Sequence, residues 1–163
     1  MRAVAVLIVA LVAVTAASAA SITRAAKTAS YSLTLAVGPM EPMYTQAEAK
    51  KMHLKAGEVM VGATSMAGSM TAMKGEALRH LEVQVKSRSS GAVVTNVTPQ
   101  ITVTNTSAMS MGATKVNAMA MQGIGKGTAD LHYGNNVSLK GGDTYKVSVV
   151  VRGEKASFVF KAT

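Results

Sequence analysis

Apolar and polar residues alternate with a period of two over much of the chain after residue 30. This alternation is typical of strands that bury one face and expose the other. The segments with this pattern, or with short β-branched runs, are residues 31–37, 58–63, 79–86, 100–104, 115–121, 137–139, 144–151 and 155–160. Gly-rich turns separate most of them. The pattern predicts an all-β fold, an immunoglobulin-like antiparallel β-sandwich of about seven or eight strands.

Three stretches break the alternation. Residues 45–54 predict one short surface helix, because Thr45 precedes an Ala- and Lys-rich run and Glu48 follows at the spacing of a capping box. Residues 21–30 are small and basic and predict a loose leader. In residues 130–137, Gly134 and the two asparagines after it tolerate left-handed backbone, which predicts a tight turn into a strand.

The first twenty residues have the pattern of a secretory signal. Arg2 precedes an unbroken apolar run from Ala3 to Val14, and Ala17-Ser18-Ala19 supplies small residues for cleavage. The run is shorter than the ~20 residues that span a bilayer. We therefore expect residues 1–20 to be a cleaved signal peptide. Residues 21–163 would then be a single immunoglobulin-like domain, periplasmic or secreted, without a membrane anchor.

Charge and cysteine content narrow the function classes. The net charge is +9, from 17 Lys and Arg against 8 acidic residues, but the basic residues are scattered. There is no Trp, and only two Phe and four Tyr are available for stacking on bases. We therefore expect no nucleic-acid partner. The chain has no cysteine and so forms no disulfide, and its stability must come from an ordinary core.

Candidate ligands for a metal ion occur in two parts of the chain. His80 and Glu82 are two residues apart on a predicted strand, so they leave the same face, opposite Leu81. The 12 methionines include Met119 and Met121, which share a face by the same rule. Thioethers are soft ligands that suit Cu(I), and imidazole suits several transition metals. The alternatives for these residues are an exposed polar pair and ordinary core packing.

Three fragments together resemble a known family. His80-Leu81-Glu82, Met119-Ala120-Met121 and His132-Tyr133-Gly134-Asn135-Asn136-Val137 follow the order seen in the periplasmic ferrous-iron transport accessory proteins, over residues 79–163. Those proteins are immunoglobulin-like sandwiches that bind copper and iron through a His-x-Glu strand, a Met-Pro-Met segment and a His-Tyr-Gly-x-Asn turn. Carried over residue by residue, the resemblance implies metal ligands at His80, Glu82, Met121 and His132.

The resemblance also implies a function. We expect an exported protein that holds copper or ferrous iron for periplasmic uptake or delivery, with an inner-membrane iron or metal permease as partner and a homodimer as its assembly. Met-Pro-Met is Met-Ala-Met here, and the stretch between Met121 and His132 is longer and Gly-rich. The alternative is a structural or adhesive sandwich module with no metal site. We do not expect an enzyme, because the chain has no nucleophile elbow, no Cys nucleophile and no paired carboxylates.

Overall fold

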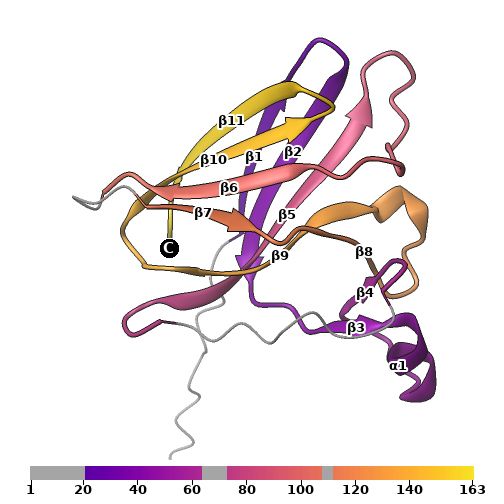
Figure 1. Ribbon diagram of the computed structural model, residues 1–163. Coiled ribbons are helices and arrows are strands. Elements are labelled where there is room, and N and C mark those ends of the chain that lie inside the picture. The colour runs from indigo at the N-terminus through magenta and orange to yellow at the C-terminus, as the bar shows by residue number, and fades with distance from the viewer. Residues whose placement is uncertain (1–20, 64–72, 108–111) are drawn as a thin grey trace, which may run out of the picture.

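The alternating segments form the strands of two facing β-sheets in the computed structural model (Figure 1). The structure describes residues 21–63, 73–107 and 112–163, so the expected signal peptide and the methionines Met66, Met70, Met109 and Met111 lie outside the described residues. No helix in the described part of the chain is long and apolar enough to cross a membrane.

The larger sheet carries most of the candidate chemistry. Its seven strands are, in order, β1 (Ile22–Lys27), β2 (Tyr31–Pro39), β5 (Ala77–Ser87), β9 (His132–Leu139), β8 (Met119–Gly123), β4 (Glu58–Met60) and β3 (Met43–Thr45). Neighbouring strands are antiparallel except β3 and β4, which are parallel. Strands from distant parts of the chain are thus brought side by side at β5, β9, β8 and β4.

The smaller sheet closes the sandwich. Its strands are β11 (Glu154–Lys161), β10 (Thr144–Val151), β6 (Gln100–Asn105) and β7 (Ala113–Val116), all paired antiparallel. Between the sheets lies one hydrophobic cluster, to which β2 contributes Leu33 and Leu35, β5 contributes Leu81 and Val83, and β11 contributes Phe158. The predicted all-β sandwich is therefore confirmed, although eleven strands are present rather than seven or eight.

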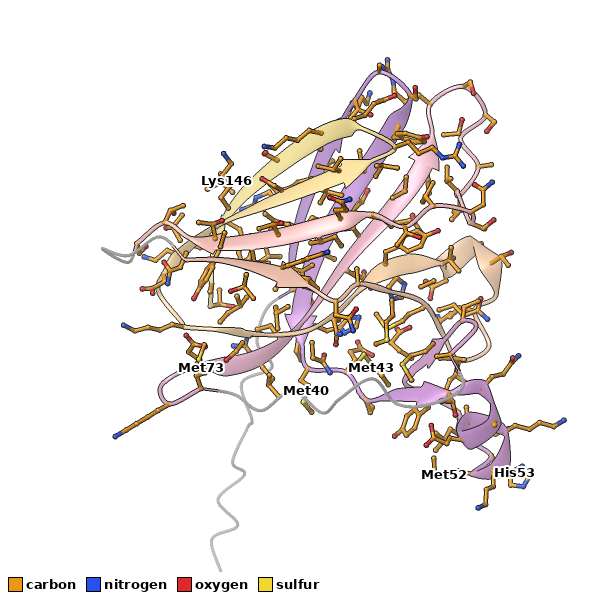
Figure 2. The ribbon with its side chains drawn as sticks, in the orientation of Figure 1. Met40, Met43, Met52, His53, Met73 and Lys146 are labelled. Atoms are coloured by element: carbon orange, nitrogen blue, oxygen red, sulfur yellow. The ribbon has the colours of Figure 1, made fainter. Side chains whose placement is uncertain are left out.

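The one helix begins with the capping box that the sequence predicts. Thr45 caps α1 (Gln46–Lys51): its hydroxyl accepts a hydrogen bond from the Glu48 amide at 3.2 Å, and the Glu48 carboxylate accepts one from the Thr45 amide at 2.8 Å. These two bonds satisfy amides that the first turn would otherwise leave unpaired. Met52 and His53 follow the helix, and Figure 2 shows both at its outer end, pointing away from the sheets.

Three local predictions were wrong. Residues 22–27 form β1 in full register with β2 instead of a loose leader. Residues 115–121 form two strands, β7 and β8, that belong to different sheets and part at Asn117. The predicted turn at residues 130–137 is mostly strand, because β9 already begins at His132. β1 is added to the sheet edge as a hairpin with its neighbour β2. For β8 and β9, pairing with strands distant in sequence overrides the local preference.

One connection passes over the site described below. Between Pro39 of β2 and Met43 of β3 the chain crosses to the far edge of the larger sheet, past β5, β9, β8 and β4. We call residues 40–42 the crossing segment (Figures 1 and 2). It is fastened to β9, because the Asn136 amide donates to the Glu41 carbonyl at 2.8 Å and its oxygen accepts from the Glu41 amide at 3.3 Å.

Candidate metal centre

The candidate ligands lie on the outer face of the larger sheet, opposite the hydrophobic core. On β5 the core face carries Leu81 and Val83, so His80 and Glu82 project from the other face. His132 begins the adjacent strand β9, and its ring lies edge-on to that of His80, with 5.9 Å between centroids and 85° between planes. The two histidines therefore approach one another from neighbouring strands of one sheet.

Carboxylates surround the Nε2 atom of His132. The Oε2 atom of Glu58, on β4, is 3.4 Å from it, and the Oε2 atom of Glu82 is 3.5 Å from it. His80, Glu82 and His132 each offer a ligand atom within 4.8 Å of the others, and so do Glu58, Asp130 and His132. A single cation, or two neighbouring ones, fits the chemistry of these donors.

Most of these groups are shielded from water. His80 and His132 are each 4% exposed and Glu58 is 8% exposed, whereas Glu82 is half-buried. The Nε2 atoms of both histidines and Oε2 of Glu58 are buried without a hydrogen-bond partner. An unsatisfied buried polar atom costs roughly 1–3 kcal/mol. Unsatisfied buried polar atoms of this kind call for an explanation, and each of the three belongs to a residue of one of the two potential ligand groups.

The other nitrogen of each imidazole is anchored by a neighbour. His132 Nδ1 donates to the Asp130 carbonyl at 2.8 Å, because a carbonyl only accepts. His80 Nδ1 lies 3.1 Å from the side-chain oxygen of Asn136, which is identified as oxygen because it also accepts from the Glu41 amide. With Nδ1 as the donor, the Nε2 atom of each neutral ring carries a free lone pair. Such anchoring of the second nitrogen is usual for histidines that bind metals.

Electrostatics distinguish His80 from Glu58. Burial lowers the pKa of His80, so its ring stays neutral and able to bind a cation at neutral pH. Burial raises the pKa of Glu58 to about 7, the His132 ring opposes this, and Glu41, Asp130 and Glu82 add to it. The pKa of Glu58 is high mainly because burial disfavours the charged carboxylate, and the acidic groups around it add to this effect. A bound cation would supply positive charge and favour the carboxylate.

Gly134 allows the two histidine-bearing strands to pack closely. It pairs with Glu82 of β5 on one side and with Met119 of β8 on the other. A Cβ atom at this position would overlap the Leu81 carbonyl oxygen of β5. Any side chain larger than hydrogen would therefore push β9 away from β5. The glycine in the His-Tyr-Gly fragment serves this close contact and not a turn.

The structure brings the four predicted residues to one region. His80, Glu82 and His132 form one potential ligand group, and Met121 is paired directly with His132 on the neighbouring strand β8. Glu58 and Asp130 are additional candidates that the sequence did not identify as ligands. Glu58 begins a predicted strand at residues 58–63, but nothing local showed that this strand, β4, lies beside β8. His53 is exposed and belongs to neither ligand group.

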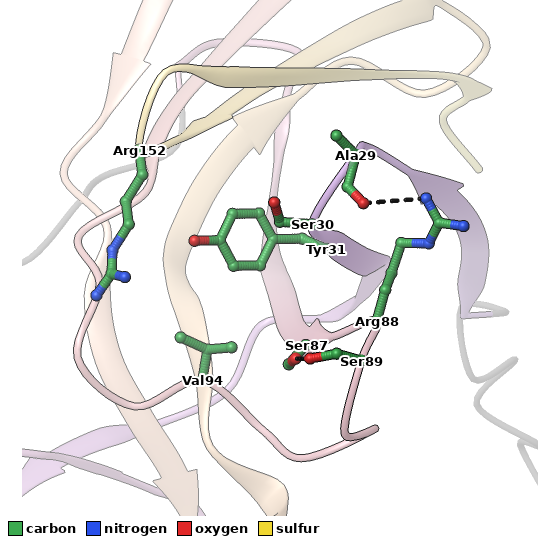
Figure 3. A pocket seen from close by; sticks show the side chains of 8 residues that line it. All are labelled: Ala29, Ser30, Tyr31, Ser87, Arg88, Ser89, Val94 and Arg152. Atoms are coloured by element: carbon green, nitrogen blue, oxygen red, sulfur yellow. Dashed lines mark hydrogen bonds between the residues drawn. The ribbon is translucent and has the colours of Figure 1, made fainter.

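A second concavity has a different character. A pocket of about 440 Å³ is lined by Ala29, Ser30, Tyr31, Ser87, Arg88, Ser89, Val94 and Arg152 (Figure 3). Its guanidiniums are already hydrogen-bonded: Arg88 donates to the Thr28 and Ala29 carbonyls at 2.8 and 3.1 Å, and Arg152 donates to Asn96. None of these lining residues is a carboxylate, an imidazole or a thioether, so the pocket offers no comparable metal site.

Comparison with known proteins assigns the chain to a family. The family model described as Fe2+ transport protein matches residues 40–161, which includes the strands carrying His80, Glu82, Glu58 and His132. Neither the curated proteins nor the solved structures gave a match. The match extends over well more than half of the 163 residues. The resemblance seen in the three sequence fragments is confirmed: the chain belongs to the Fe2+ transport protein family.

Proposed function

We propose that this protein binds a divalent metal ion as cargo, ferrous iron or copper, at His80, Glu82 and His132, with Glu58 as a further carboxylate ligand and Met121 beside them. The observation that carries the proposal is the pair of buried Nε2 atoms, each with a free lone pair and no hydrogen-bond partner. The Glu58 and Glu82 carboxylates lie 3.4 and 3.5 Å from the Nε2 atom of His132. The family match to Fe2+ transport proteins supports the same conclusion.

The mix of ligands fits both ions. Two neutral imidazoles and two carboxylates suit Fe(II), and imidazole with a thioether suits copper. The two carboxylates also balance the charge of a divalent cation, which makes it easier to hold in a largely buried site. A structural or adhesive module would have no reason to keep three unsatisfied polar atoms together, because satisfied or apolar groups would make it more stable.

The proposed setting is transport outside the cytoplasm. The apolar run of residues 3–14, followed by small residues, supports export through a cleaved signal peptide, and hence a periplasmic or secreted protein. A protein that holds metal cargo there would exchange it with an inner-membrane iron or metal permease. A homodimer is the assembly that the resemblance implies. Chemical cross-linking and mass measurement of the native protein test both partners.

A binding experiment with one matched control tests the metal site. Anaerobic titration of Fe(II), and separately of Cu(II), compares the wild type with His132→Ala and with His53→Ala, whose histidine is exposed at the end of α1. We expect His132→Ala to weaken binding of both ions at least about 100-fold, since it removes the central ligand, and His53→Ala to change little. Equal binding by wild type and a folded His132→Ala would refute the site.

A further inference from the structure

The outer face of the smaller sheet carries basic side chains and, among its described residues, no acidic ones. Alternation turns every second residue of its strands away from the hydrophobic cluster. The lysines among these outward residues are all exposed and lie on β7, β10 and β11: Lys115, Lys146, Lys155 and Lys161. The other outward residues are Gln100, Thr102, Thr104, Ala113, Thr144, Ser148, Val150, Ser157 and Val159. We call this surface the lysine face.

Strand register gathers these lysines from separate parts of the sequence. Lys161 is opposite Thr144, two residues before Lys146 on the same face, so the two lysines are diagonal neighbours. Lys155 lies at the other end of β11 from Lys161, ~20 Å away along the extended strand. Lys115 lies at the far edge of the sheet, on β7. The positive charges therefore spread over the whole face, and one small anion could not contact them all.

The lysine side chains have no partner that explains their place in the fold. In the part of the chain that the structure describes, none of the four makes an ion pair or a hydrogen bond. The described arginines, in contrast, each donate to a backbone carbonyl: Arg24, Arg79, Arg88 and Arg152. Lysines on edge strands such as β7 and β11 discourage pairing with other chains. That explanation does not cover Lys146, because β10 is paired on both sides. Figure 2 shows Lys146 pointing away from the sheets, at the opposite end of the view from α1.

The opposite side of the sandwich gathers acidic side chains. Four of the eight acidic residues surround the candidate metal ligands of the larger sheet: Glu41, Glu58, Glu82 and Asp130. Solvated surfaces usually mix both signs of charge. Here an extended anionic surface would attract the lysine face and repel the side with the candidate metal centre. The charges therefore give the molecule a preferred orientation on such a surface.

We propose that the lysine face docks on the anionic phospholipid headgroups of a membrane surface. Headgroup phosphates form an extended two-dimensional array, which matches the spread of the lysines over a sheet face, and clusters of four or more basic residues are typical of such binding. Lysine ammoniums are flexible point charges that suit this diffuse attraction, whereas a single phosphate or carboxylate is held better by arginine. Val159, 57% exposed on β11, adds an apolar side chain that can contact the headgroup layer. Docking leaves the candidate metal centre facing away from the membrane.

Binding to lipid vesicles tests the proposal. The protein is mixed with vesicles of phosphatidylcholine, and with vesicles that also contain phosphatidylglycerol, at low and at high salt. The test variant neutralises the lysine face: Lys115→Gln, Lys146→Gln, Lys155→Gln and Lys161→Gln. The matched control removes the same charge at exposed lysines of β1 and of α1 and the residues after it: Lys27→Gln, Lys50→Gln, Lys51→Gln and Lys55→Gln. Circular dichroism checks that both variants are folded.

The expected result is loss of binding in the test variant alone. Wild type should bind only the vesicles with phosphatidylglycerol, and should be released by high salt. Each lysine should contribute about fivefold in affinity, so the test variant should bind at least about 100-fold more weakly, and the control should stay within about threefold of wild type. No binding by wild type, unchanged binding by the test variant, or an equal loss in the control would overturn the proposal.

Two further comparisons identify the partner and separate this proposal from the metal site. Binding of duplex DNA or polyglutamate through the same lysines, without binding of vesicles, would assign the face to another anionic partner and overturn membrane docking. His132→Ala should bind vesicles like wild type, because His132 lies on the other sheet. Vesicle binding and metal binding can therefore fail independently.

A fluorescent label reports the orientation on the membrane. The chain has no cysteine, so one introduced cysteine can carry a polarity-sensitive fluorophore. Val159→Cys places the label on the lysine face, and Thr34→Cys places it on the outer face of the larger sheet, where Thr34 is also exposed. Vesicles with phosphatidylglycerol should shift the emission of the Val159→Cys label to the blue and leave that of the Thr34→Cys label unchanged. Equal shifts would overturn the lysine face as the docking surface.

Discussion

At the scale of single residues, Glu58 shows most clearly that a group suited to metal binding can lower the stability of the metal-free protein. Its carboxylate is buried beside His132, Glu82 and Asp130 with Oε2 unpartnered, and burial raises its pKa to about 7. In the unfolded chain the carboxyl group of Glu58 ionises near its ordinary pKa of 4.5. Between these two values the folded state holds the proton more tightly. The metal-free protein should therefore lose stability as pH rises through this window.

Replacing Glu58 by Gln tests this. Below pH ~4.5 wild type and Glu58→Gln should be equally stable without metal, because both side chains are neutral. At pH 8 the metal-free variant should be more stable by roughly 1–3 kcal/mol, since no unpaired carboxylate is buried. Urea unfolding in the presence of chelator at both pH values measures the difference. A variant that is less stable than wild type at pH 8 would contradict this account of the site.

Asn136 is the residue that positions His80. It accepts from His80 Nδ1 at 3.1 Å and is also bonded to both backbone groups of Glu41 in the crossing segment. Asn136→Ala should leave the ring of His80 free to turn and should lower Fe(II) affinity by about 10–100-fold. Ser138→Ala, two residues on and on the same strand face, is the control. Equal affinity of the two variants, both folded, would show that Asn136 does not orient the ligand.

At the scale of elements, the β1–β2 turn is tied to the hairpin of the smaller sheet. Glu154, which starts β11, accepts a hydrogen bond from the Ser30 amide at 2.9 Å. Arg88 donates to the Thr28 and Ala29 carbonyls in the same turn, and Figure 3 shows the bond to Ala29. Hydrogen bonds from Ser30 and Thr28 lower the pKa of Glu154 to about 2. Because the folded pKa lies below the ordinary value, the tie stabilises the fold above pH ~4.5 and is lost as pH falls toward 2.

The contribution of the Glu154 hydrogen bonds is measured by urea unfolding of wild type and Glu154→Gln at a series of pH values, with the unfolding midpoint as the readout. Glu154→Gln should unfold at a lower urea concentration at pH 7, and the gap should narrow steadily below pH ~4.5 as the wild-type carboxylate protonates. The effect should be modest, because the group is on the surface and screened by solvent. A gap that stays constant down to pH 3 would show that ionisation of Glu154 plays no part.

Elements with a strong local signal were predictable from the sequence, and those set by distant partners were not. Alternation marked residues 79–86 and 144–151, and a capping box marked the helix after Thr45, because these signals lie within a few neighbouring residues. Residues 132–137 contain three turn-forming residues, yet they form a strand. Pairing of this strand, β9, with β5 on one side and β8 on the other outweighs the turn preference of these residues. Gly134 is needed there because a side chain would clash with β5.

At the scale of the whole molecule, the site is assembled by topology. His80 and Glu82 could be placed on one face from spacing alone, but His132, Met121 and Glu58 come from three other strands of the same sheet. The sequence fragments indicated His132 and Met121 through resemblance to a family. Glu58 gave no such signal, because its role depends on β4 lying beside β8.

The central claim is that one metal ion binds between the two histidine rings and the carboxylates of β5 and β4. The most direct measurement is anomalous diffraction at the iron absorption edge from crystals soaked anaerobically with Fe(II). The account predicts an iron peak within bonding distance of Nε2 of both His80 and His132, with Glu82 or Glu58 as a further ligand. An iron peak elsewhere on the protein, or none beside these two nitrogens at saturating Fe(II), would contradict it.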